Sequence, residues 1–139
     1  MKVLTASLVL AMAMATSAAA ASNAFTGAWR SIDVDGSYQQ LFIGGGPSGL
    51  RVQYVDHSAT LCHDLGAPNG VATIRGTGTM SGSTLTVSFN EIRCSGGIVF
   101  ATPGGGWTFS HDPDSGTLVV NFGSESEPHW IIWGRIGSR

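Results

Sequence analysis

Short segments in which apolar and polar residues alternate, separated by glycine-rich turns, constrain this chain most. Residues 50–54 (LRVQY) and 84–89 (TLTVSF) place apolar side chains at every second position. This period of two is typical of β-strands that bury one face and expose the other. No sustained helical spacing of apolar residues follows the first 24 residues. The sequence therefore predicts an all-β fold.

The turns divide the chain into eight predicted strands. Asp35-Gly36 is typical of a tight hairpin, because both residue types tolerate positive φ. Residues 57–70 show no clear period and are expected to form a long loop. The strands are expected at residues 26–34, 37–44, 49–56, 71–80, 83–93, 97–102 together with 106–111, 117–122 and 129–136. Short connections favour an eight-stranded antiparallel up-and-down barrel, which has no exposed edges. A two-layer β-sandwich is the alternative.

The first 24 residues have the three-part plan of a secretory signal peptide. A positive start (Met1-Lys2) precedes an apolar run at 3–15 and a small-residue stretch at 16–24. The apolar run is shorter than the ~20 residues that span a bilayer. Cleavage is expected after Ala21 or Ala24, leaving residues 25–139 as one domain. The expected location is secreted or periplasmic, with no membrane span.

The charge of residues 25–139 argues against nucleic-acid binding. This part of the chain has no lysine, six arginines and nine acidic residues, a formal charge of −3. Binding to a phosphate backbone relies on clustered lysine and arginine side chains. We therefore expect no nucleic-acid partner.

Cys62 and Cys94 are the only two cysteines, and in an exported chain they predict a disulfide. Closing a loop of this length is worth about 3–4 kcal/mol in the loop-entropy treatment. Residues 56–64 also contain two histidines and two aspartates, the only cluster of potential metal ligands. Their spacing does not match a zinc site, so neither a metal nor a cofactor is predicted.

No complete catalytic motif is present. The chain has no Gly-x-Ser-x-Gly elbow, and nothing in the sequence selects a pair of carboxylates for acid–base chemistry. Whether the protein is an enzyme stays open, with a binding protein favoured. Trp130 and Trp133 fall on opposite faces of the last predicted strand, so one of them is expected to be exposed or to line a cavity.

Two short motifs lie at the ends of the predicted barrel. Gly27-Ala28-Trp29 lies on the first strand and Trp133-Gly134-Arg135 on the last. This pair resembles the calycin superfamily of lipocalins and avidins, where an arginine of the final strand packs over a Gly-x-Trp of the first. The resemblance implies that Trp29 and Arg135 close the barrel and that its cup binds a small, mostly apolar molecule. Residues 33–37 and 56–62 also look like those of small exported bacterial proteins of unassigned function, which implies no activity.

The leading functional hypothesis is an exported, non-enzymatic β-barrel that binds a small hydrophobic ligand inside the barrel or at its mouth. An extracellular or envelope interaction module, such as an inhibitor of a secreted enzyme, is the alternative; it would act through residues 44–49, 57–70 and 103–106. A secreted hydrolase is the third hypothesis, and the oligomeric state stays open. The candidate ligand-lining residues are the inward positions of the clearest strands: Leu50, Val52, Tyr54, Leu85, Val87, Phe89, Trp107 and Phe109.

Overall fold

The computed structural model describes residues 24–32, 36–46, 49–101, 106–121, 126 and 129–137. All of the predicted signal peptide except Ala24 lies outside these residues, as does Asp35 of the predicted hairpin turn. None of the described helices is long and apolar enough to cross a membrane.

The described residues form nine strands, and the positions of these strands follow the alternating segments of the sequence. They are β1 (Gly27–Ile32), β2 (Tyr38–Gly46), β3 (Gly49–Asp56), β4 (Ala72–Ser81), β5 (Thr84–Cys94), β6 (Val99–Ala101), β7 (Gly106–Asp112), β8 (Thr117–Asn121) and β9 (Trp130–Arg135). Each strand boundary lies within two residues of the predicted one.

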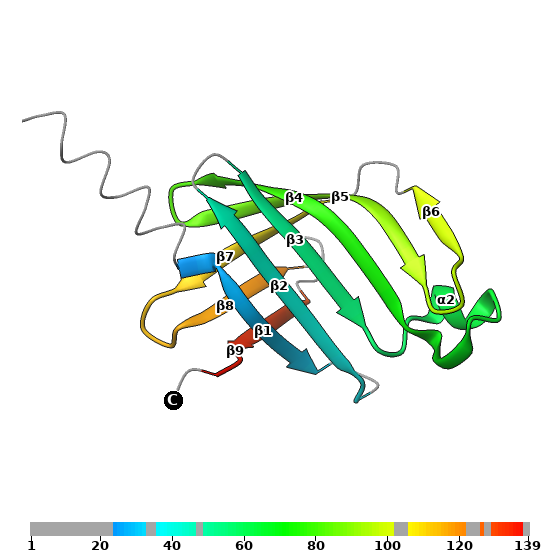
Figure 1. Cartoon of the computed structure of the whole chain (residues 1–139). Coiled ribbons are helices and arrows are strands. Elements are labelled where there is room, and N and C mark those ends of the chain that lie inside the picture. Colours follow the sequence, from blue (N-terminus) through cyan, green and yellow to red (C-terminus); the bar gives the residue numbers. More distant parts are fainter. Residues whose placement is uncertain are drawn as a thin grey trace, which may run out of the picture.

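Eight of these strands close into an antiparallel barrel (Figure 1). The order runs β1-β2-β3-β4-β5-β7-β8-β9, and β9 returns to β1 through the pairs Trp29↔Arg135 and Arg30↔Gly134. Closure supplies a hydrogen-bonding neighbour on both sides of every barrel strand, which removes the exposed edges. The predicted all-β barrel is therefore confirmed, and the sandwich alternative is wrong.

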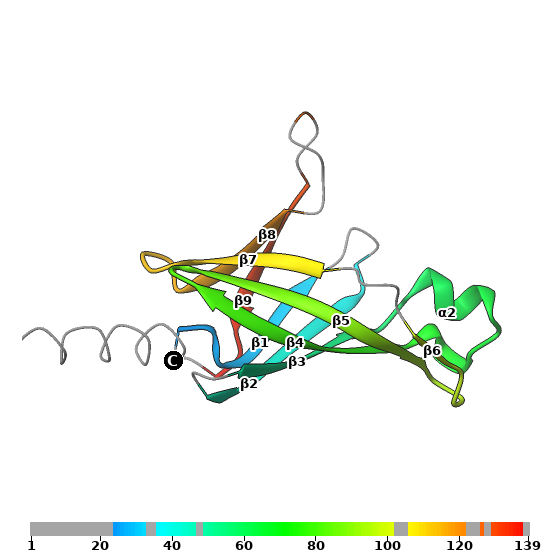
Figure 2. The ribbon, with the colours of Figure 1, turned by 90° about the horizontal axis from the view of Figure 1, so that it is seen from above.

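The sixth predicted strand forms two separate strands. Both pair with β5, but β7 pairs with Thr84–Ser88, whereas β6 pairs with Glu91–Arg93. Between them Asn90 is an extra residue of β5, because Gly76 opposes Phe89 and Arg75 opposes Glu91. A β-bulge of this kind bends a strand. The far half of β5 consequently leaves the barrel and carries β6 with it (Figure 2).

A small lobe stands beside the barrel, where β6 and the segment after β3 meet (Figures 1 and 2). The expected loop at 57–70 contains a short helix, α2 (Thr60–Asp64), and a 3₁₀ turn, η1 (Pro68–Gly70). Five residues are too few to show a helical period in the sequence. The Sγ atoms of Cys62 and Cys94 are 2.00 Å apart, a disulfide distance consistent with an extracellular or periplasmic location.

The barrel interior holds the main hydrophobic core. Its fully buried side chains come from all eight barrel strands except β4, where Gly78 leaves room for Leu50, Val52 and Leu85. The core residues are Phe25, Trp29, Leu41, Ile43, Leu50, Val52, Tyr54, Leu85, Val87, Phe89, Phe109, Leu118, Val120 and Trp133. Side chains of this size fill an eight-stranded barrel.

One end of the barrel is sealed by the segment just before β1. The Arg135 guanidinium lies 4.3 Å from the centre of the Trp29 ring and donates to the carbonyl oxygens of Ala24 (2.8 Å) and Thr26 (2.7 Å). Trp29 Nε1 donates to the Phe25 carbonyl at 2.9 Å, and the Phe25 ring is buried. We call this arrangement the Arg135 lock. Gly27 belongs to it, because an added Cβ would stand 2.9 Å from Arg135 Nη1.

Candidate functional site

The predicted ligand-lining residues all lie in the main core or against it. Seven of the eight are between 0 and 6 % exposed, and Trp107 is partly buried. These side chains pack against one another along the barrel axis. Any ligand that enters there has to displace part of this packing, and Trp107 is the member with the most solvent contact.

Five aromatic rings meet at the barrel end opposite the Arg135 lock. The Trp107 ring on β7 lies edge-on to Tyr54 of β3 and Phe89 of β5, with centroid distances of 4.8 Å to each. Phe109 completes the contacts of Trp107 at 6.0 Å, and Trp133 of β9 lies 5.9 Å from Tyr54. Edge-to-face pairs of this spacing are favourable beyond their burial alone. We call these five residues the aromatic cluster.

Polar groups are buried near the aromatic cluster. Ser31 and Gln39 face each other across β1 and β2 and are 8 % and 4 % exposed. The Tyr54 hydroxyl donates to Asp56 Oδ2 at 3.2 Å. Trp133 Nε1 is buried and has no hydrogen-bond partner among the residues that the structure describes. A buried donor without an acceptor is destabilising by about 1–3 kcal/mol.

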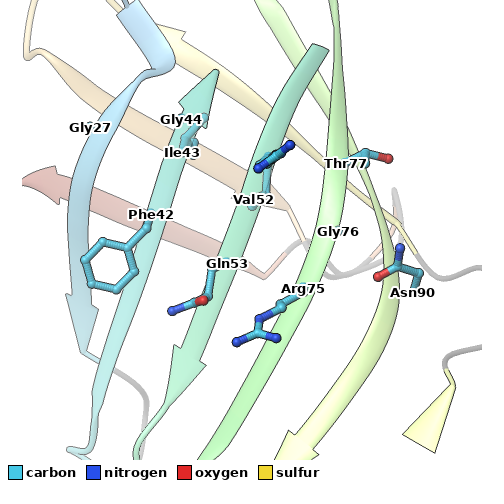
Figure 3. Close-up of a pocket in the computed structure, with 11 residues that line it drawn as sticks. Gly27, Phe42, Ile43, Gly44, Val52, Gln53, Arg75, Gly76, Thr77 and Asn90 are labelled. Atoms are coloured by element: carbon cyan, nitrogen blue, oxygen red, sulfur yellow. The ribbon is translucent and has the colours of Figure 1, made fainter. Parts of the chain in front are cut away.

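A hollow lies on the outside of the barrel, as an open groove of about 700 Å³ across β2 to β5. Phe42, Gln53 and Arg75 stand in one row, since each is paired with the next across neighbouring strands (Figure 3). Gly44, Arg51 and Thr77 form the next row in the same way. We call this hollow the outer groove. Its lining residues are Gly27, Phe42, Ile43, Gly44, Arg51, Val52, Gln53, Arg75, Gly76, Thr77 and Asn90.

The titratable groups of the described residues make local contacts. No three His, Cys, Asp or Glu residues within the described ranges converge as metal ligands. His57 Nε2 lies 3.1 Å from the amide oxygen of Gln40. In the hairpin between β7 and β8, the Ser115 hydroxyl and then the Asp114 amide hold the pKa of Asp112 below its ordinary value.

Sequence reasoning missed the arginines of the outer groove and the buried polar pair. The alternation does place Arg51 and Gln53 on the outer face of their strand, and it places Gln39 on the inner face with Leu41 and Ile43. The alternation along each strand therefore indicates on which face of the sheet these residues lie. Which side chains meet across neighbouring strands depends on the register of the strands, and alternation within one strand does not determine that register. For the two tryptophans of β9, Trp130 is 61 % exposed and Trp133 is buried, as their opposite faces predict.

Comparisons with protein-family models, with curated protein sequences and with solved structures found no match to this chain. The chemistry of the aromatic cluster and of the outer groove therefore has to be inferred from their own residues. The closed eight-stranded antiparallel barrel is compatible with the calycin resemblance noted in the sequence.

Proposed function

We propose that the protein binds a small, mostly apolar ligand at the aromatic cluster. The observation that carries the proposal is the buried Trp133 Nε1–H, which has no acceptor within the described part of the chain. A ligand oxygen such as a carbonyl would supply that acceptor and relieve the desolvation penalty. The ligand is therefore an apolar molecule with one hydrogen-bond acceptor.

Entry of the ligand requires Trp107 to turn aside. It is the partly exposed member of the cluster, and it contacts Tyr54, Phe89 and Phe109. Its neighbours Tyr54 and Phe89 are 5 % and 6 % exposed, in contrast to the 0 % exposure of Phe109. Ligand binding then exchanges the Trp107 ring for the ligand, and apolar burial is maintained.

The same proposal includes a calycin-like barrel and export from the cell. The Arg135 lock supports the first point, since Gly27, Trp29 and Arg135 stand together where the first and last strands pair. Cys62 and Cys94 support the second, because disulfides persist in oxidising compartments.

The test compares two ligands of nearly the same shape, 2-acetylnaphthalene and 2-ethylnaphthalene, of which only the first carries an acceptor. The affinity of each compound is measured by its displacement of the fluorescent probe N-phenyl-1-naphthylamine from the protein. We expect the wild type to prefer the ketone by about tenfold, the worth of one buried hydrogen bond. The variant Trp133→Phe loses this preference and still binds both compounds. Trp130→Ala, which removes an exposed tryptophan from the same strand, leaves both affinities unchanged.

Native mass spectrometry of protein purified from its own culture medium tests the proposal independently of the probe. An additional mass of a few hundred daltons that is lost in Trp107→Ala supports the aromatic cluster as the site. The proposal fails if the wild type binds neither naphthalene compound, or binds both equally, and carries no additional mass.

An interaction module is the second candidate, and exposed apolar residues in the lobe favour it. Leu61 and Leu65 lie one helical turn apart on α2 and at its C-cap, with 47 % and 43 % exposure. Val99 of β6 is 46 % exposed. Inhibition assays against secreted proteases and lysozymes test this candidate: inhibition that is lost in Leu61→Glu supports it, and no inhibition of either class rejects it.

A further inference from the structure

The outer groove has a different chemistry from the aromatic cluster. Strands β2 to β5 and Gly27 of β1 line it, and the side chains of Phe42, Gln53 and Arg75 point away from the barrel core (Figure 3). Two guanidinium groups, two amides, one hydroxyl and one phenyl ring line it, supplied by Arg51, Arg75, Gln53, Asn90, Thr77 and Phe42. From this arrangement we propose that the outer groove binds a linear polysaccharide that carries carboxylate groups, a polyuronate.

The charge of this face points to an anionic ligand. Strands β1 to β5 present Arg30, Arg51, Arg75 and Arg93 as exposed residues. Glu91 is the one acid these strands place on that outer face within the described residues. The chain as a whole is negative, with a formal charge of −2. Positive charge is therefore concentrated on one side of a negative protein, which attracts an anionic partner to that side.

Both groove arginines are available to a carboxylate. The Arg51 guanidinium has no hydrogen-bond or ion-pair partner within the described part of the chain. Arg75 is paired with Glu91 at 3.4 Å, and Glu91 is shared with Arg93 at 3.5 Å. The side chains of Arg75 and Arg93 are 53 % and 47 % exposed, and ion pairs between exposed side chains add little to stability. A ligand carboxylate can compete with Glu91 for Arg75.

The spacing of the two arginines suits successive carboxylates along a polymer. Arg51 is opposite Thr77 in the register of β3 and β4, and Arg75 is two residues away on β4. Such diagonal positions are about 7–8 Å apart at the backbone. The arginine fork matches a carboxylate with two parallel hydrogen bonds.

Between and beside the arginines, the groove offers neutral groups that match sugar hydroxyls. Gln53, Thr77 and Asn90 supply both donors and acceptors. Phe42, 37 % exposed, offers an apolar ring to the C–H face of a sugar at the β2 side. An acidic peptide matches this groove less well, since β2 to β5 are already paired on both sides and offer no free edge for strand addition.

The outer groove is hollow partly because Gly44 has no side chain. A Cβ placed at Gly44 meets no atom within 4 Å, and the residue does not need positive φ. A large side chain at this position therefore fills the groove without disturbing the barrel. Gly44→Trp is for this reason the sharpest variant with which to block the site.

Binding of polygalacturonate is measured by calorimetry at physiological ionic strength, where surface charges are screened beyond about 8 Å. We expect Arg51→Ala to weaken binding about tenfold or more, the worth of a charge-assisted hydrogen bond. Arg93→Ala removes the same charge from the same face outside the groove, and we expect less than a threefold effect. Gly44→Trp abolishes binding while its melting temperature stays at the wild-type value.

Two other polymers decide between sugar recognition and charge alone. Poly-glutamate carries carboxylates without sugar rings, and dextran carries hydroxyls without charge. At least tenfold weaker binding of both supports the polyuronate site. The proposal is overturned if poly-glutamate binds as well as polygalacturonate, if Gly44→Trp binds like the wild type, or if polygalacturonate does not bind. None of these results depends on ligand binding at the aromatic cluster.

Discussion

Removing the guanidinium of Arg135 should destabilise the whole barrel, although Arg135 is a near-terminal residue on the last strand. Its two hydrogen bonds hold the carbonyl oxygens of Ala24 and Thr26, and its planar face covers Trp29. These contacts join the segment before β1 to β9, where the barrel closes. Arg135→Ala therefore loosens the strand pair that turns the sheet into a barrel.

The magnitude is estimated from the two hydrogen bonds and the cation–π contact described above, all of which the substitution removes. Each hydrogen bond from a charged donor is worth about 1.5–3 kcal/mol, and the cation–π contact about 0.5–2 kcal/mol. The side chain is only partly buried, so the lower ends apply, and the expected loss in unfolding free energy is about 3–4 kcal/mol. For a domain of this size, that lowers the melting temperature by roughly 12–15 °C.

Thermal unfolding followed by circular dichroism measures the effect. Arg135→Lys keeps the charge but cannot form both hydrogen bonds or stack, so about half of the loss is expected. Arg30→Ala is the matched control: it removes an exposed guanidinium of β1 that lies 5.4 Å from the centre of the Tyr38 ring on β2, and it should cost less than about 1 kcal/mol. A melting temperature for Arg135→Ala no lower than that of Arg30→Ala would refute the reasoning.

Three further predictions concern the lobe, a surface turn and the N-terminus. Cys62→Ser with Cys94→Ser should lower the unfolding free energy by about 2–4 kcal/mol in urea titrations, an effect that reducing agent reproduces in the wild type. Asp112→Asn should be less stable than the wild type at pH 6, because folding lowers the pKa of this aspartate and so favours its charged form. The difference in unfolding free energy between the two proteins should shrink as the pH falls below 3.8 and through the lowered pKa. The exported protein should begin directly after Ala21, since cleavage after Ala24 removes a carbonyl that the Arg135 lock uses; intact-mass measurement distinguishes the two.

The sequence by itself determined the strands and the face on which each side chain lies. Alternation assigned Leu50, Val52 and Tyr54 to the inside, and all three are buried. The turn residues set the short connections that make neighbouring strands antiparallel. Counting the strands then led to the closed barrel, because closure is the arrangement that leaves no edge unpaired.

Only the tertiary structure decided which distant residues become neighbours. The bulge at Asn90 bends β5, and this local departure from strand geometry separates the part of β5 that pairs with β6 from the part that pairs with β7. The register between β3 and β4 brings Arg51 and Arg75 to one groove, a placement that neither strand encodes alone.

Packing likewise decided whether the barrel interior has space for a ligand or is filled by side chains. Alternation along a strand indicates that a side chain points inward, but the summed volume of all inward side chains determines the space that remains inside the barrel. Trp133 shows the difference plainly, since its inward position follows from alternation while its unpartnered N–H follows from what surrounds it. A strand pattern is a local property of the chain, whereas a binding site depends on contacts between residues far apart in sequence.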